Sequence, residues 1–142
     1  MAGRAPLVID SSGINHSVPD HFQDIVIQLN PQSGALADVD DSVLYYAERD
    51  TVVDAAFITA SAADGDQTLQ LKRLDADTTD PDSAGTAFSN AQVVAAAYTP
   101  YTLTITETEN FIPAGSMVAV NVETDGTAGQ VTIQLRIRTR VG

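Results

Sequence analysis

Strict alternation of apolar and polar residues recurs along most of this chain and is the feature that most limits its fold. The clearest case is the segment QVTIQLRIRTR, in which one face carries Val131, Ile133, Leu135 and Ile137. A period of two places successive side chains on opposite faces of a strand. The segment is therefore expected to form a strand that buries one face and exposes the other.

Comparable patterns predict about seven strands in total. Alternation appears again in QDIVIQLN, QTLQLKRL, YTLTITET and SMVAVNVET, while SVLYYAE and TVVDAAFITASA are expected strands of less clear register. The expected core includes Leu103, Ile105, Val118, Val120, Ile133 and Leu135. Several antiparallel strands with turns between them predict an all-β fold, an antiparallel two-sheet β-sandwich of the jelly-roll kind.

Turn residues indicate how these strands are joined. The segment ADGD at 63–66 predicts a hairpin with Asp-Gly at its tip, and TDGTAG at 124–129 joins the last two strands. The segment IPAG predicts a type I turn with Pro113 at its second position and Gly115 at its fourth. An Ala-rich stretch, 87–98, breaks the alternation and predicts one short helical excursion, with Ser89 or Asn90 as its N-cap.

The chain divides into an N-terminal arm or extended segment, residues 1–23, and a single sandwich domain, residues 24–142. The arm is rich in Pro, Gly and Ser and has one apolar cluster, Leu7, Val8 and Ile9. Such a segment buries little surface by itself, so it either packs on its own sandwich or docks on a partner. We take these three residues as candidate partner-binding residues.

Composition excludes several classes of function. The chain has 142 residues, a formal net charge of −12 and no Cys. Such an acidic chain is repelled by phosphate backbones, so a nucleic-acid partner is not expected. No apolar run is long enough to cross a membrane. The apolar run before Asp10 is too short for a signal peptide, so synthesis in the cytoplasm is expected.

Patterns that would indicate catalysis or metal binding are incomplete. The acidic loop 75–86 carries four aspartates but lacks the Gly and Glu of an EF-hand; we favour a solvated loop, and weak calcium binding stays open. His16 and His21 flank Pro19, which prevents a helix from placing both rings one turn apart. No nucleophile elbow or phosphate-binding loop is present. We expect no enzyme activity, no metal and no cofactor.

Three arginines stand apart from this acidic background. Arg136, Arg138 and Arg140 share one face of the last strand, in a segment without any acid. One interpretation is that they balance acidic side chains of the same molecule. The other is that they form ion pairs with an acidic partner, which could be another copy of this chain. They are candidate interface residues on the second interpretation.

The C-terminal half has a recognisable order of elements. The stretch YTLTITETENFIPAGSMVAVNVETDGTAGQVTIQLRIR places a strand, a FIPAGS corner and a final hairpin in succession. It resembles small jelly-roll or β-sandwich proteins of tailed phages, among them capsid decoration (cement) proteins and some tail and head-fibre proteins. The resemblance covers roughly residues 43–140 and carries no binding residues position by position.

The resemblance implies a non-enzymatic virion structural protein. Decoration proteins of this type bind the outer surface of an expanded capsid and stabilise contacts between subunits of the major capsid protein. The expected partners are then the major capsid protein and further copies of this chain, with a homotrimer favoured over a dimer. The alternative is a tail or head-fibre module that binds a host-surface glycan.

Overall fold

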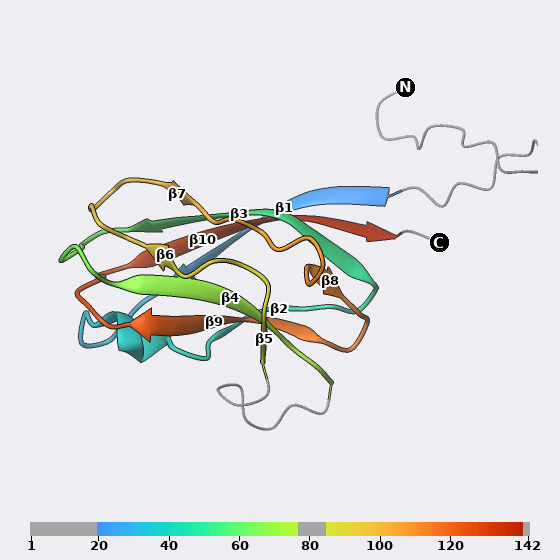
Figure 1. The fold of residues 1–142 in the computed structure, drawn as a ribbon, viewed down its shortest axis with the longest axis horizontal. Helices are drawn as coiled ribbons and strands as arrows, with labels where there is room; N and C mark the ends of the chain where they lie inside the picture. The colour runs from blue at the N-terminus through green and yellow to red at the C-terminus, as the bar shows by residue number, and fades with distance from the viewer. Residues whose placement is uncertain (1–19, 77–84, 141–142) are drawn as a thin grey trace, which may run out of the picture.

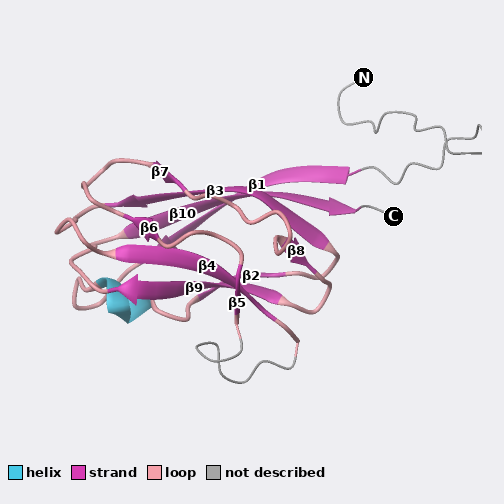
Figure 2. Cartoon of the chain, viewed as in Figure 1, coloured by secondary structure: helices cyan, strands magenta, loops and turns pink. Residues whose placement is uncertain are grey.

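The computed structural model describes residues 20–76 and 85–140 and confirms the all-β prediction. Almost every regular element is a strand (Figure 2). The strands are β1 Asp20–Leu29, β2 Val43–Tyr46, β3 Thr51–Ala60, β4 Thr68–Leu74, β5 Thr86–Ala87, β6 Gln92–Val93, β7 Tyr101–Thr102, β8 Phe111–Ile112, β9 Met117–Thr124 and β10 Val131–Arg140. Within this part of the chain the one helical element is a 3-10 turn, η1, Leu36–Val39. Since β1 begins at Asp20, strand pairing extends four residues into the segment that the sequence assigns to the arm.

Two antiparallel sheets form the upper and lower layers in Figure 1. The described residues give one sheet, here sheet 1, the order β1-β10-β3-β7, with β8 also on β3. The other, sheet 2, has the order β2-β9-β4-β5, with β6 also on β4. If β5 with β6, and β7 with β8, each count as one interrupted strand, the order is that of an eight-stranded jelly roll.

The core lies between the sheets, and the residues predicted to be buried lie in it. Leu135, Ile133, Val118 and Val120 are fully buried, Leu103 is 3% exposed, and Ile105 packs against them partly buried. These positions confirm the predicted core. The strand expected at 101–108 is much shorter, because β7 ends at Thr102 and Ile105 makes only an isolated bridge.

The helical excursion predicted at 87–98 is wrong. The stretch begins in β5 and then forms β6, and both pair with the edge of β4. Phe88 and Val94 are buried from this position, and the Ser89 hydroxyl accepts the Leu71 N–H at 2.9 Å. Burial of these two side chains outweighs the high helix propensity of the alanines, because propensity differences amount to only about 0–0.7 kcal/mol per ordinary residue.

TDGTAG joins the last two strands as predicted, but the hairpin pairing expected there and at ADGD is wrong, because each connection crosses from one sheet to the other. The ADGD segment lies between β3 of sheet 1 and β4 of sheet 2, and the TDGTAG segment lies between β9 of sheet 2 and β10 of sheet 1. Asp-Gly supplies the positive φ that a sharp turn needs, here +105° at Gly65, but it does not decide which strands pair.

These two crossings are hydrogen-bonded to each other. The buried Gln67 side chain donates from Nε2 to the Thr127 carbonyl at 2.8 Å and accepts the Asp64 N–H at 3.0 Å. Gly126 packs so closely here that a Cβ would lie 2.6 Å from side-chain oxygens of both Asp64 and Gln67. The crossings therefore close one end of the sandwich as a unit.

The FIPAGS corner turns one residue later than predicted. The Ser116 N–H donates to the Pro113 carbonyl at 3.0 Å, so Pro113 is the first residue of the turn and Gly115 the third. Gly115 has φ +92°, which type II turns require at the third position and type I turns do not. The predicted type I turn is therefore wrong.

Candidate functional site

The arginine face of β10 lies in the middle of sheet 1, where both flanking strands present acids to it. Asp24 of β1 is the register partner of Arg136, and its Oδ1 lies 3.1 Å from Arg136 Nε. On the other side, the guanidinium of Arg136 lies 5.9 Å from the centroid of the Phe57 ring. This distance allows a cation–π contact.

Arg138 is paired through an irregularity in β3. The register between β10 and β3 shifts after Arg136, so that Asp54 becomes an extra residue in β3. Bulges of this kind redirect a side chain. The Asp54 carboxylate accepts a hydrogen bond from Arg138 Nε at 2.8 Å.

These contacts favour the first interpretation of the arginines, in which they balance acids of the same sheet. Both side chains of the Arg136–Asp24 pair are about half exposed, so the pair contributes roughly 0–1 kcal/mol to stability. Arg140 pairs through its backbone with Asp20 at the end of β10, and its side chain lies outside the described residues. Leu7, Val8 and Ile9 lie outside them as well.

A shallow groove of about 250 Å³ opens beside Arg136 on the same face. Its lining consists of Phe57, Thr59, Pro100, Thr132, Gln134 and Arg136. An aromatic ring surrounded by hydroxyl, amide and guanidinium groups can bind a small polar ligand by stacking and hydrogen bonds. The sequence analysis did not select Phe57, because one aromatic residue in an expected strand has no distinctive pattern.

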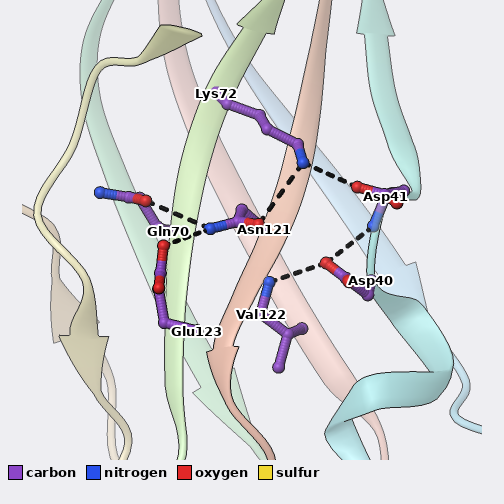
Figure 3. A network of polar contacts seen from close by, with 7 residues as sticks. All are labelled: Asp40, Asp41, Gln70, Lys72, Asn121, Val122 and Glu123. Atoms are coloured by element: carbon purple, nitrogen blue, oxygen red, sulfur yellow. Dashed lines mark hydrogen bonds and ion pairs between the residues drawn. The ribbon is translucent and has the colours of Figure 1, made fainter. Parts of the chain in front are cut away.

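Sheet 2 carries a polar network around Lys72, the one lysine of the chain (Figure 3). The Lys72 side chain is 5% exposed, and its Nζ lies 2.7 Å from Asp41 Oδ1 and 3.4 Å from Asn121 Oδ1. Asn121 in turn donates to Glu123 at 2.6 Å and to Gln70 at 3.3 Å. A buried ammonium group has to be matched by a carboxylate, and Asp41 supplies it.

The same network fixes the chain segment between η1 and β2. Asp40 Oδ1 accepts the Val122 N–H at 2.9 Å, and the Asp41 N–H donates to the Val120 carbonyl at 2.9 Å. Asp41 has φ +63°, an uncommon value for a residue other than glycine. We interpret this network as a structural clasp that holds the segment before β2 on β9 and β4.

Asp38 in η1 has a lowered pKa. The Ser33 hydroxyl donates to Asp38 Oδ2 at 2.5 Å, and the Ser33 backbone N–H donates to the same oxygen at 2.7 Å. These two hydrogen bonds stabilise the charged carboxylate and lower the pKa of Asp38 below its ordinary value. Asp38 is exposed, and its contacts with Ser33 stabilise the turn before η1.

The described residues hold no group of three His, Asp or Glu side chains that could bind a metal ion. His21 is exposed on β1, and His16 lies outside the described residues. In the acidic loop 75–86, Asp75 pairs with Arg73 at 3.1 Å, while residues 77–84 are not described. The other three aspartates of the loop, Asp77, Asp80 and Asp82, lie outside the described residues, so the structure does not test weak calcium binding there.

Large apolar side chains are exposed at the two strands that form one side of the sandwich. Phe22 and Val26 of β1 are 65% and 61% exposed, and Val43 and Tyr46 of β2 are 51% and 56% exposed. Alternation in QDIVIQLN assigns Ile25 and Ile27 to the buried face, so it already placed Val26 on the opposite, exposed face. The exposure of Phe22 was predictable in the same way. It lies two residues before the polar residue Asp24, so both side chains point to the face opposite that of Ile25.

No model of a known protein family and no curated protein matches this chain. Within residues 20–76 and 85–140, none of the helical structure has the length and apolar character that a membrane-spanning helix needs. Any assignment of function therefore depends on the fold, the surface and the resemblance described above.

Proposed function

We propose that this protein is a non-enzymatic structural component of a phage virion. It binds the outer surface of the capsid and stabilises contacts between subunits of the major capsid protein. The observation that carries the proposal is the strand order, because the resemblance implies a jelly roll and the observed order is that of a jelly roll. Fold alone supports many functions, so the surface has to support the proposal as well.

The FIPAGS corner, which carries the resemblance, has a mechanical role in this fold. The Gly115 N–H donates to the Ala47 carbonyl at 2.7 Å, and the Ala47 N–H donates to the Ser116 carbonyl at 2.9 Å. The Ala114 N–H donates to Asp50 Oδ1 at 3.0 Å. The corner therefore ties the link between β8 and β9 to the link between β2 and β3, which supports a role that depends on rigidity.

The charge of the chain fits the outer rather than the inner surface of a capsid. With a net charge of −12, the protein is repelled by packaged nucleic acid. On the outer surface it meets capsid protein instead. The N-terminal cluster Leu7, Val8 and Ile9 is the proposed anchor to the capsid or to a neighbouring copy, by addition of an extended segment to a sheet edge.

Copy number tests this proposal. The measurement is the molar ratio of this chain to the major capsid protein in purified particles, by quantitative mass spectrometry. Decoration predicts hundreds of copies per particle, in a fixed ratio to the capsid subunits. A few copies per particle would contradict decoration and favour a tail or fibre location, and absence from the particles would contradict both.

The groove beside Phe57 favours one alternative, a tail or head-fibre module that binds a host-surface glycan. The Phe57 ring can stack on the apolar face of a sugar, and the side chains of Gln134 and Arg136 can form hydrogen bonds with its hydroxyl groups. Titration with host-surface oligosaccharides, followed by NMR, tests this candidate. Saturable shifts that disappear in Phe57→Ala, but not in the control Phe111→Ala at another exposed site, would support it.

A further inference from the structure

The sheet edges of this jelly roll differ sharply in length. In the described residues, the edges of sheet 2 are formed by β2, with four residues, and by β5 and β6, with two residues each. The far edge of sheet 1 is formed by β7 and β8, also with two residues each. Among the described strands only β1 is a long edge strand, with ten residues paired to β10 on one side; its position at the edge of sheet 1 can be followed in Figure 1.

The β1 edge also lacks the features that protect exposed edges from pairing. Native edge strands are commonly blunted by Pro, by Lys, by a bulge or by an unpaired charge. The β1 sequence, DHFQDIVIQL, has no Pro and no Lys, and its register with β10 is continuous over all ten residues. Its central charge, Asp24, is already paired with Arg136.

The core is incompletely covered at the same edge. Ile133 and Leu135 of β10 are fully buried, whereas their register partners on β1, Ile27 and Ile25, are only partly buried. On the outer face of β1, Phe22 and Val26 are exposed. A strand added beside β1 would cover apolar side chains on both faces and would pair the outer backbone groups, which no described strand pairs.

We propose that the occupant is β1 of a second copy of this chain, paired antiparallel about a two-fold axis at Val26. This register places Val26 opposite Val26 on the outer face and Ile25 opposite Ile27 on the core face. It also places Asp24 opposite Gln28, so that no like charges face each other. Sheet 1 then continues from one copy into the other.

Charge disfavours one alternative register. A shift that centres the pair on Asp24 would set two carboxylates directly opposite each other, and like charges at such positions are destabilising. A shift by one residue alone is excluded, because it would turn the core face of one strand toward solvent. The strand is therefore self-complementary in a way that a partner of unrelated sequence need not be.

The proposal changes the preferred oligomer. A ring of three copies needs contacts between two different surfaces, whereas a strand that pairs with itself produces a two-fold contact. The β1 edge therefore favours a dimer, which the sequence analysis retained as the alternative to a trimer. This pairing does not depend on the proposed capsid function, because it concerns the isolated protein.

Single cysteines test the register directly, since the chain has none of its own. In the proposed dimer Val26→Cys faces its counterpart at roughly 4.5–5.5 Å between Cβ atoms, close enough for a disulfide after a small adjustment. The matched control is Phe22→Cys, on the same face of the same strand. Its counterpart lies eight residues away along the pair, at roughly 27 Å, which no disulfide spans.

The expected result is a covalent dimer of full-length Val26→Cys after mild oxidation, and none for Phe22→Cys. Sedimentation of the wild-type protein should give twice the 14.9 kDa mass of the chain. Val26→Arg, which sets two like charges opposite each other, should convert the dimer to monomer, while Val93→Arg on β6 should not. Both valines are exposed, so neither change should prevent folding.

Three results would overturn the proposal. Equal cross-linking of both cysteine variants would indicate random collision rather than pairing. A monomeric full-length protein would leave the β1 edge to another partner or to another segment of the chain. A trimer, or a dimer that survives Val26→Arg, would place the contact elsewhere on the molecule.

Discussion

At the scale of single residues, Gln67 joins the two crossings between the sheets and is fully buried. Its Nε2 donates to the carbonyls of Ala62 and Thr127, and its Oε1 accepts the Asp64 N–H. We predict that Gln67→Leu lowers the free energy of unfolding by roughly 1–3 kcal/mol, because these backbone groups lose their partner without gaining water. Chemical denaturation measures this loss.

The control for Gln67 is Gln130→Leu, at an exposed side chain on the same pair of crossings. Its Nε2 donates to Gln28 Oε1 at 3.3 Å, and a change below about 0.5 kcal/mol is expected for such an exposed side chain. Equal losses for the two variants would show that Gln67 has no special role.

Ile133 tests the assigned faces of β10. Its side chain is fully buried between the sheets. We expect Ile133→Asp to cost several kcal/mol, because it buries a carboxylate without a partner, and a loss of this size can unfold a domain of ordinary stability. The readout is the thermal unfolding curve, with Thr132→Asp on the outer face as the charge-matched control. An unchanged melting temperature for Ile133→Asp would show that the face assignment is wrong.

At the scale of elements, the sequence predicted the positions of the strands well, but it predicted poorly which strands pair with each other. Alternation identified the long strands β4, β9 and β10 and their buried faces, because it reports burial directly. It could not show that ADGD and TDGTAG connect different sheets, since a sharp turn has the same residues in a hairpin and in a crossing. It also missed β5 and β6, where contact with β4 outweighs the local preference of an Ala-rich segment.

The candidate site was predicted in part. The arginine face of β10 was visible as a stripe, but the acids that neutralise it come from strands more than 80 residues away in the sequence. Alternation placed Val26 on the outer face of β1, but it could not show that β1 lies at the edge of sheet 1. Such features depend on strand order, which no local pattern contains.

The arginine stripe yields a prediction at this scale. Arg136 and Arg138 are paired with Asp24 and Asp54 in their own sheet, and in the proposed dimer Asp24 faces the uncharged Gln28 of the other copy, so replacing both arginines with Gln should leave the oligomer intact. The expected loss of stability is small, at most about 1 kcal/mol for each exposed pair. Sedimentation of the double variant is the measurement. Dissociation of the oligomer would instead favour the interpretation in which the stripe faces a neighbour.

At the scale of the whole molecule, the described strands enclose a continuous core between the two sheets. The buried core residues of the described structure lie between Leu36 and Ile137. We therefore predict that deletion of residues 1–12 leaves the melting temperature nearly unchanged and reduces attachment to capsids. Cosedimentation with particles measures the attachment. A milder variant combines Leu7→Ser, Val8→Ser and Ile9→Ser without deleting any residue. Unfolding of the truncated protein, or undiminished attachment, would contradict the anchor.

The central claim, a structural role on the outside of a capsid, is tested most directly by a reconstruction of the intact particle. The account predicts density for this sandwich on the outer surface, in many symmetry-related copies that bridge neighbouring subunits of the major capsid protein. Density confined to the tail or to a fibre, or none that fits this sandwich, would contradict it.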